Sequence, residues 1–412
     1  MTPKFRALCL VPVFVAALFL SGCSKFSCPT THLGSSGSGS GKGGINAGGS
    51  LCGSGGGISG SEAALVYFQN FDNTGASVID GAVLTTSGQF TQLTATPVTT
   101  TGQHTDDMTI VGGKFLYVPF SDTNTNTVEA FSIDHTTGAL TPIAGSPFAL
   151  PAGTADTAVA DPQGRFLFVG SEGSGLISVF QIDATTGALT LNLASPFTSF
   201  NLFFADSVTV DGTGNFLYVG QLDPTIPLDA FSIDQNNGAL SEIGAFDLGV
   251  AQLHADPSGK FLLGVAEIQD AFPSATDQHI YVFAIDSLTG APSPVAGSPF
   301  ATTSAPFDFA ISPNGEFVYV VGNDTSGSIA AVEGYQLDTT TGALTALPGS
   351  PFTTLPTDLV QCKFEQGGGE MVCTSESWNN FSVLTTNPST GAVTNTVPDL
   401  SVPLSFPFTV TD

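Results

Sequence analysis

The sequence predicts an all-β fold built from seven repeated units, and two observations support this prediction. A short turn phrase recurs with glycines 50, 49, 51, 52, 52 and 49 residues apart, at Gly88, Gly138, Gly187, Gly238, Gly290, Gly342 and Gly391. Between these glycines, short runs of alternating apolar residues are separated by turns rich in Gly, Asp and Pro. A period of this length with four strands is typical of propeller blades. We therefore predict a seven-bladed β-propeller with four-stranded blades.

The third repeat illustrates the expected order of strands, which we name A to D from the ring axis to the rim. Residues 156–160 form strand A, 166–170 strand B, 176–183 strand C and 188–192 strand D. The A–B turn at 161–165 reads DPQGR, in which Gly supplies a positive φ angle and Asp-Pro begins the turn. Alternating aromatic residues such as Phe166 and Phe168 in strand B are expected to pack between neighbouring blades.

The two ends of the repeated region are expected to share one blade. The first repeat begins at strand B, with LVYFQN from Leu65, and has no strand A. The chain ends in SFPFTVTD, which parallels the strand A segment around Phe307. We predict that this final strand completes blade one, because the closure hides two sheet edges. The predicted propeller spans residues 62–412.

The amino-terminal residues are expected to direct export. Lys4 and Arg6 precede an apolar run from Ala7 to Leu20, a pattern typical of a secretory signal peptide over residues 1–22. The segment Leu20–Cys23 resembles the bacterial lipobox, which implies cleavage before Cys23 and attachment of lipid to that cysteine. Ser24 resembles the sorting signal for the outer membrane. We therefore expect an exported lipoprotein anchored in the outer membrane or at the cell surface.

Residues 23–61 are mostly Gly and Ser, and this composition predicts a flexible tether. From Glu62 onward the chain carries all 35 acidic residues but only 4 of the 8 basic ones. Such a surface repels phosphate backbones, so nucleic-acid binding is excluded. The four basic residues, Lys114, Arg165, Lys260 and Lys363, are all expected in A–B turns. The opposite face would then have no fixed positive side chain.

Acidic residues are expected to surround a funnel on that opposite face. Each B–C loop contributes one, at Asp122, Glu172, Asp223, Glu267, Asp324 and Glu376, with Asp72 in blade one. Others precede or begin strand A, at Asp107, Asp156, Asp206, Asp308 and Asp358. Oxygen ligands in this number favour Ca²⁺ as a cofactor, held by the B–C loop acids from Asp122 to Glu376. The alternative is that these acids only keep the surface soluble.

Two further residues, His104 and Trp378, complete the candidate site. His104 lies near the acidic face and, with Asp156 and Asp206, is the candidate catalytic group. Trp378 could stack on a sugar and joins Asp107, Asp308 and Asp358 as candidate ligand-binding residues. Neither His104 nor His279 has a Ser or Cys partner in a recognisable triad. The recurring Asp before each repeat glycine, such as Asp183, is interpreted as a turn cap rather than a site residue.

Cysteine usage fits an oxidising compartment. Cys362 in strand A and Cys373 in strand B face each other about a hairpin centre between Gly367 and Gly368. We predict a cross-strand disulfide between these two cysteines. Cys28 and Cys52 would pair by elimination.

Repeats such as SPNGEFVYVVGNDTSGSIAAVEGYQLDTTTGALTALPGSPF resemble those of the lactonase-like seven-bladed propellers, the 6-phosphogluconolactonase type. The resemblance extends from about Leu65 to Asp412 and implies lactone hydrolysis. The Pro-His pair often found at the start of strand A in that family is missing here, so no catalytic residue is carried over from it.

Two main functions follow from these observations. The first is a lipid-anchored binding or scaffold module of the cell envelope, with a funnel that holds a cation, a saccharide or a protein. The alternative is hydrolysis of a neutral lactone, since an anionic substrate ordinarily needs Arg or Lys near the reacting group. A purely structural role in the envelope also remains open.

Overall fold

The computed structural model describes residues 62–71, 76–85, 87–102, 105, 107–122, 125–171, 174–198, 205, 207–221, 225–266, 277–323, 331–353, 359–375, 380–394, 400–401 and 407–411. The chain divides into two compact units, Met1–Gly56 and Gly57–Asp412. The predicted signal peptide, Cys23 and the pair Cys28 and Cys52 all lie outside the described residues, which belong to the second unit.

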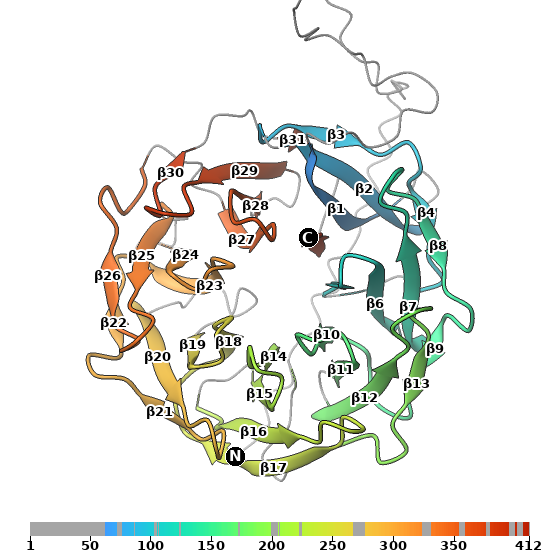
Figure 1. Cartoon of the computed structure of the whole chain (residues 1–412), viewed down its shortest axis with the longest axis horizontal. Helices are drawn as coiled ribbons and strands as arrows, with labels where there is room; N and C mark the ends of the chain where they lie inside the picture. Colours follow the sequence, from blue (N-terminus) through green and yellow to red (C-terminus); the bar gives the residue numbers. More distant parts are fainter. Residues whose placement is uncertain are drawn as a thin grey trace, which may run out of the picture. The chain divides into compact units, whose positions relative to one another are not determined.

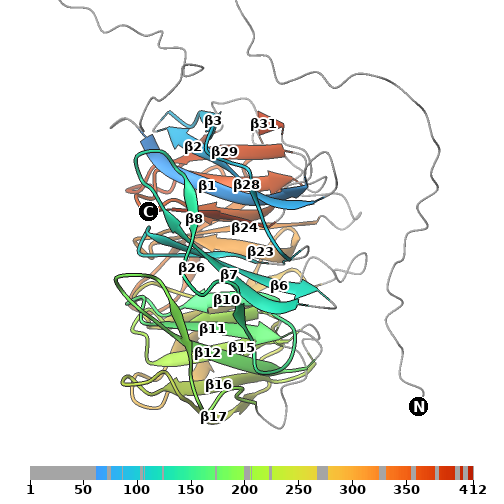
Figure 2. The same ribbon diagram turned by 90° about the vertical axis from the view of Figure 1, so that its right-hand side faces the viewer.

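The predicted seven-bladed propeller is confirmed. In the second unit, seven antiparallel sheets are arranged in a ring, with the A strands nearest the centre and the D strands outside (Figure 1). Seen from the side, the strands cross the thickness of the ring (Figure 2). Strand A of blades two to seven is β5, β10, β14, β18, β23 and β27.

Blade one contains both ends of the repeated region. It consists of β1 (Glu62–Phe71), β2 (Ser77–Thr85), β3 (Phe90–Gln92), the short β4 (Val98–Thr99) and β32 (Phe408–Val410). The carboxyl-terminal β32 pairs antiparallel with β1, with Phe68 opposite Phe408 and Val66 opposite Val410. Thr411 strengthens the closure, because its hydroxyl accepts a hydrogen bond of 2.7 Å from the Leu65 amide. The predicted closure of blade one is therefore confirmed.

Blades two to four follow in chain order. Blade two comprises β5 (Thr109–Val111), β6 (Phe115–Asp122), β7 (Thr125–Ile133), β8 (Leu140–Pro142) and β9 (Phe148–Ala149). Blade three comprises β10 (Thr157–Ala160), β11 (Phe166–Ser171), β12 (Leu176–Ile182) and β13 (Leu189–Leu191). Blade four comprises β14 (Ser207–Val210), β15 (Phe216–Gly220), β16 (Leu228–Ile233) and β17 (Leu240–Phe246).

Blades five to seven complete the ring. Blade five comprises β18 (Gln252–Ala255), β19 (Phe261–Val265), β20 (His279–Ile285), β21 (Pro292–Pro294) and β22 (Phe300–Ala301). Blade six comprises β23 (Ala305–Ile311), β24 (Phe317–Asn323), β25 (Glu333–Leu337) and β26 (Leu344–Ala346). Blade seven comprises β27 (Leu359–Phe364), β28 (Glu370–Ser375), β29 (Asn380–Thr386), β30 (Val393–Thr394) and β31 (Leu400–Ser401). The short β4, β9, β22 and β31 each follow strand D in the chain and pair with strand C of the same blade.

The core is divided among the interfaces between neighbouring blades. One apolar cluster joins Phe115 and Tyr117 of blade two to Leu167, Val169 and Phe180 of blade three. A tyrosine in strand B adds a hydrogen bond to each of four interfaces, since its buried hydroxyl donates to the repeat-glycine carbonyl of the next blade. These bonds run from Tyr67 to Gly138, Tyr117 to Gly187, Tyr218 to Gly290 and Tyr319 to Gly391, at 2.7–2.9 Å.

The repeat glycine is required by both its backbone and its surroundings. Gly187 has a φ angle of 72°, in the left-handed region. A Cβ atom there would lie 2.5 Å from Cδ1 of Phe115 in the preceding blade. Four residues earlier, the Asp183 carboxylate accepts hydrogen bonds from the Thr185 and Thr186 amides. These bonds, led by the one from Thr186, lower the pKa of Asp183. The interpretation of this Asp as a turn cap is confirmed.

Candidate functional site

The described residues include part of the predicted site. Asp107, Asp156 and Asp308 are described with their side chains, whereas only the backbone of Asp122 is described, at the end of β6. The remaining predicted residues lie outside the described residues: His104, Glu172, Asp206, Asp223, Glu267, Asp324, Asp358, Glu376 and Trp378. The calcium funnel and the role of His104 therefore stay predictions.

Side chains alternate along the A strands between apolar packing and polar positions near the axis. In blade seven, Cys362 is buried in the cluster between blades six and seven, while Lys363 beside it is partly exposed. At the polar positions, residues in or just before the A strands of different blades meet. Thr157 of blade three, for example, donates a hydrogen bond of 3.5 Å to Asp107 of blade two. We call His254, Asp308, Lys363 and Asp107 the axial site; they come from blades five, six, seven and two.

Lys363 occupies a different place from the one expected. Lys114, Arg165 and Lys260 lie in A–B turns as predicted, but Lys363 lies within strand A, in β27. Its ammonium group is 3.1 Å from Oδ1 of Asp107 and 5.5 Å from the ring centre of Phe408. The lysine thus reaches from blade seven past β32 of blade one to blade two. The expectation that the acidic groups have no positive neighbour is wrong, because Lys363 lies in strand A, one residue before the strand ends at Phe364, and pairs with Asp107.

His254 also belongs to this arrangement, although it lies within strand A and was not among the candidate residues from the sequence. Nε2 of His254 lies 3.5 Å from Oδ1 of Asp308 on the neighbouring β23. Asp308 is 7% exposed, and its Oδ1 atom has no hydrogen-bond donor among the described residues. The imidazole is 43% exposed and packs edge-on against the Phe309 ring. A half-exposed histidine beside a buried carboxylate is a pair suited to proton transfer.

Asp156 is buried beside this site. It is 6% exposed and accepts a hydrogen bond of 2.5 Å from the Thr154 hydroxyl. Its own amide donates to the Gly170 carbonyl of strand B at 3.1 Å. These contacts place Asp156 at the start of strand A, as the sequence suggested.

Two buried carboxylates that sequence reasoning missed hold the connections between blades. Glu129 on β7 accepts hydrogen bonds from the Thr101 and Gly102 amides, at 2.6 and 3.1 Å. Glu333 on β25 does the same for Thr303 and Ser304, at 2.9–3.0 Å. Their register gave a usable signal, because both are polar residues in the otherwise apolar inner part of strand C. Their amide partners assign them a structural role.

A third buried acid lies in blade seven, at the first position of strand B. Glu370 stands where Phe115, Phe166 and Phe317 begin strand B in other blades. Burial raises the pKa of Glu370 to about 7. A hydrogen bond from Thr385, 3.1 Å long, opposes this rise, and the charge of Glu365 adds to it. Its burial and its neighbours therefore set its proton affinity.

A second histidine and aspartate pair lies on strand C of blade five. Nδ1 of His279 is 2.6 Å from Oδ1 of Asp277, and the Tyr281 hydroxyl donates to the other carboxylate oxygen at 2.7 Å. Burial, followed by the bond to Asp277, raises the pKa of Tyr281 to about 12. This pair resembles the axial one in composition but sits two strands farther from the axis.

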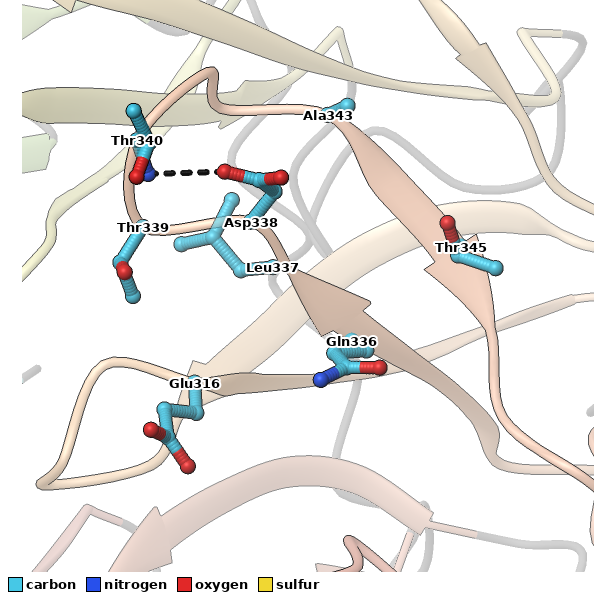
Figure 3. A pocket seen from close by; sticks show the side chains of 8 residues that line it. All are labelled: Glu316, Gln336, Leu337, Asp338, Thr339, Thr340, Ala343 and Thr345. Atoms are coloured by element: carbon cyan, nitrogen blue, oxygen red, sulfur yellow. Dashed lines mark hydrogen bonds between the residues drawn. The ribbon is translucent and has the colours of Figure 1, made fainter.

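A pocket of about 390 Å³ lies at the C–D turn of blade six. Glu316, Gln336, Thr339 and Thr345 line it, and the Thr340 amide donates to Asp338 across its rim at 2.8 Å (Figure 3). The turn at its rim recurs in other blades and is a structural feature of the repeat. We assign no ligand to it.

The predicted disulfide is present. Cys362 and Cys373 are bonded and directly opposed on β27 and β28, with Cα atoms 4.1 Å apart. Among the described residues, no group of three or more His, Cys, Asp or Glu side chains is arranged so that it could hold a metal ion. No helix with the length and apolarity of a membrane span occurs in the described part of the chain.

Comparison with known proteins agrees with this architecture. The family model described as Lactonase, 7-bladed beta-propeller, matches residues 82–199 and 245–360. A candidate 6-phosphogluconolactonase from Bacteroides uniformis is 16% identical, with a TM-score of 0.66 over 85% of this chain and 99% of that one. The periplasmic gluconolactonase PpgL of Pseudomonas aeruginosa is 15% identical, with a TM-score of 0.62 over 84% and 98%.

A further candidate 6-phosphogluconolactonase, from Bacteroides fragilis, is 17% identical, with a TM-score of 0.62 over 86% of this chain and 100% of that one. A search of curated protein sequences finds no match. At these identities the solved structures support the fold alone. The family model covers more than half of the chain, and it agrees with the repeats, the seven sheets and the closure by β32. The chain belongs to the lactonase family of seven-bladed β-propellers.

Proposed function

We propose that this protein hydrolyses a lactone at the axial site, with His254 as the general base and Asp308 as the residue that positions it. The observation that carries the proposal is the contact of 3.5 Å between Nε2 of His254 and Oδ1 of Asp308, in a chain of the lactonase family. The names of similar structures, which include a gluconolactonase, favour a sugar lactone as the substrate class.

The chemistry assigns one role to each group. Lactone hydrolysis adds water to the ester carbonyl carbon and breaks the ring C–O bond, giving a hydroxy acid. His254 would take a proton from the attacking water through Nδ1 and return it to the alkoxide that leaves. Asp308, which faces Nε2, would stabilise the imidazolium formed in between. The carboxylate is buried, so its interaction with the cation is only weakly screened.

The test is a pH-stat assay with D-glucono-1,5-lactone and δ-valerolactone, corrected for spontaneous hydrolysis. We expect H254Q and D308N to lower kcat/KM by about 100-fold or more, the contribution typical of a positioned base. H279Q and D277N are the matched controls, because they remove the same residue types from the similar pair on strand C. Equal losses in both pairs, or no turnover by the wild type, would refute the proposal.

The binding module is the competing outcome of the same experiment. A saccharide that binds with no turnover of either lactone would favour it over the enzyme. Export and anchoring through Cys23 form a separate proposal, supported by the lipobox resemblance. Metabolic labelling with palmitate tests it, since C23S should abolish the label and leave the propeller soluble.

A further inference from the structure

We propose that Asp107 sets the charge selectivity of the axial site, so that the protein accepts uncharged lactones and rejects those that carry a carboxylate or phosphate group. This inference rests on the proposed lactone hydrolysis and adds the residue that selects the substrate class. It replaces the expectation that anions are rejected because no cation is near the site.

Lys363 and the proposed base stand at equivalent backbone positions of their A strands. Lys363 pairs with Val372, the third residue of β28, and His254 pairs with Leu263, the third residue of β19. The two side chains therefore occupy the same register position in blades seven and five. Between them, β23 of blade six supplies Asp308. An anionic substrate held by the proposed base would thus find Lys363 as its natural partner.

Asp107 already forms an ion pair with Lys363. Its Oδ1 atom lies 3.1 Å from Nζ of Lys363 and accepts a hydrogen bond of 2.8 Å from the Met108 amide. Its Oδ2 atom accepts the longer bond from Thr157. Contacts from three different residues hold the carboxylate in place, so an incoming anion would have to displace a fixed intramolecular partner from Lys363.

Both members of the ion pair remain accessible to a ligand. The Lys363 side chain is 29% exposed and that of Asp107 is 30% exposed. An anion at this point would meet the like charges of Asp107 and Asp308, with one lysine already neutralised. An uncharged lactone avoids that repulsion. Asp107 therefore favours neutral ligands because it competes with anionic ligands for Lys363. The absence of a cation is not the cause.

Two other cations of the described residues are engaged at the turns, and Lys114 also lies in an A–B turn, that of blade two. Arg165 binds Asp161 through Nε at 2.8 Å, and Lys260 donates to the Thr339 carbonyl at 3.1 Å. Removal of the charge of Asp107 should thus leave Lys363 as a cation without a carboxylate partner close to the proposed base. The change would convert the site from one that rejects anions into one that binds them.

The experiment compares two matched probes, D-gluconate and sorbitol, which differ by a carboxylate in place of a hydroxymethyl group. Binding is measured by titration calorimetry on the oxidised propeller. We expect wild-type protein to bind gluconate no more tightly than sorbitol. D107N should gain about tenfold or more in affinity for gluconate, as expected for one charge-assisted contact. The double variant D107N/K363M should lose that gain.

D277N is the control for net charge, because it removes a carboxylate from the pair on strand C. D107S serves as a second variant if D107N does not fold. The proposal is overturned if wild-type protein prefers gluconate, if D107N gains nothing, or if D277N gains as much. Because the readout is binding, it is separate from turnover. A wild type that hydrolyses neutral lactones while D107N gains no affinity would refute the selectivity and leave the hydrolysis standing.

Discussion

The turns of the outer strands and the A strands near the axis follow opposite rules in this propeller. In the turns, the same contacts return from blade to blade: an Asp or Asn accepts two amide hydrogen bonds at Asp134, Asp183, Asp286, Asp338 and Asn387. In the A strands, the residue that pairs with the third residue of strand B changes along blades two to seven: Thr109, Val159, Thr209, His254, Ala310 and Lys363.

The difference separates the fold from the chemistry. A residue that recurs in every blade satisfies a need that every blade has, such as a turn cap or an interface contact. A residue that breaks the pattern, such as Lys363, is free to serve one site. The following experiments test this division, in order from the largest expected effect to the smallest.

The closing strand should be the most sensitive part of the framework. Phe408 is fully buried and packs on Phe68 and Phe381 across the junction of blades seven and one. F408A should lower the free energy of unfolding by about 3–5 kcal/mol, the range for a large aromatic side chain lost from a core. Urea denaturation measures this loss. L288A, at a turn residue that is 91% exposed, should change it little. Equal effects would show that closure contributes no special stability.

Loss of the disulfide should have the second-largest effect on stability. The bond between Cys362 and Cys373 closes a loop with a sequence separation of 11 residues. The C362S/C373S variant should lose about 2–3 kcal/mol of stability, because the unfolded chain regains the freedom that the bond removes. Thermal melting of the oxidised protein measures the loss. A reducing agent should lower the melting temperature of the wild type and leave that of the variant unchanged.

Glu370 should make the stability of the protein depend on pH between about 4.5 and 7. Its pKa is raised from 4.5 in the unfolded chain to about 7 in the folded one, so the folded state binds the proton more tightly. Stability from this group is full below pH 4.5 and is lost as pH rises toward 7, by at most about 1.4 kcal/mol per pH unit. Relative to E370Q, the wild type should therefore weaken over this window. A constant difference between the two proteins would contradict the shift.

Substitution of the interface tyrosines should have the smallest effect on the free energy of unfolding. The loss should be similar at each interface. Y117F removes only the hydroxyl that donates to the Gly187 carbonyl, at a cost of about 1 kcal/mol for one hydrogen bond. Y218F and Y319F remove the same bond at other interfaces and should cost similar amounts. Denaturant midpoints measure all three. A spread of several-fold would mean that the repeated contacts are not equivalent.

Much of the fold could be predicted from local patterns, and the axial site could not. The turn residues, the closing strand and the disulfide each depend on neighbours in sequence or on the repeat period, so the sequence carried their signal. Lys363 was placed on the wrong face and His254 was not proposed as a site residue, because their partners, Asp107 and Asp308, belong to other blades. The assignment of Lys363 also failed on a small error, because strand A of blade seven continues to Phe364.

The sequence by itself determined the number of blades, the four-stranded plan and the junction at blade one, because a periodic chain can bury its apolar faces only by stacking one repeat on the next. Only the tertiary structure decided which charged groups meet. Ring closure brings residues 256 positions apart, Lys363 and Asp107, within hydrogen-bonding distance. A periodic sequence pattern shows the features that all blades share. A contact between residues of different blades depends on the geometry of the whole ring, which is set by the twist of each sheet.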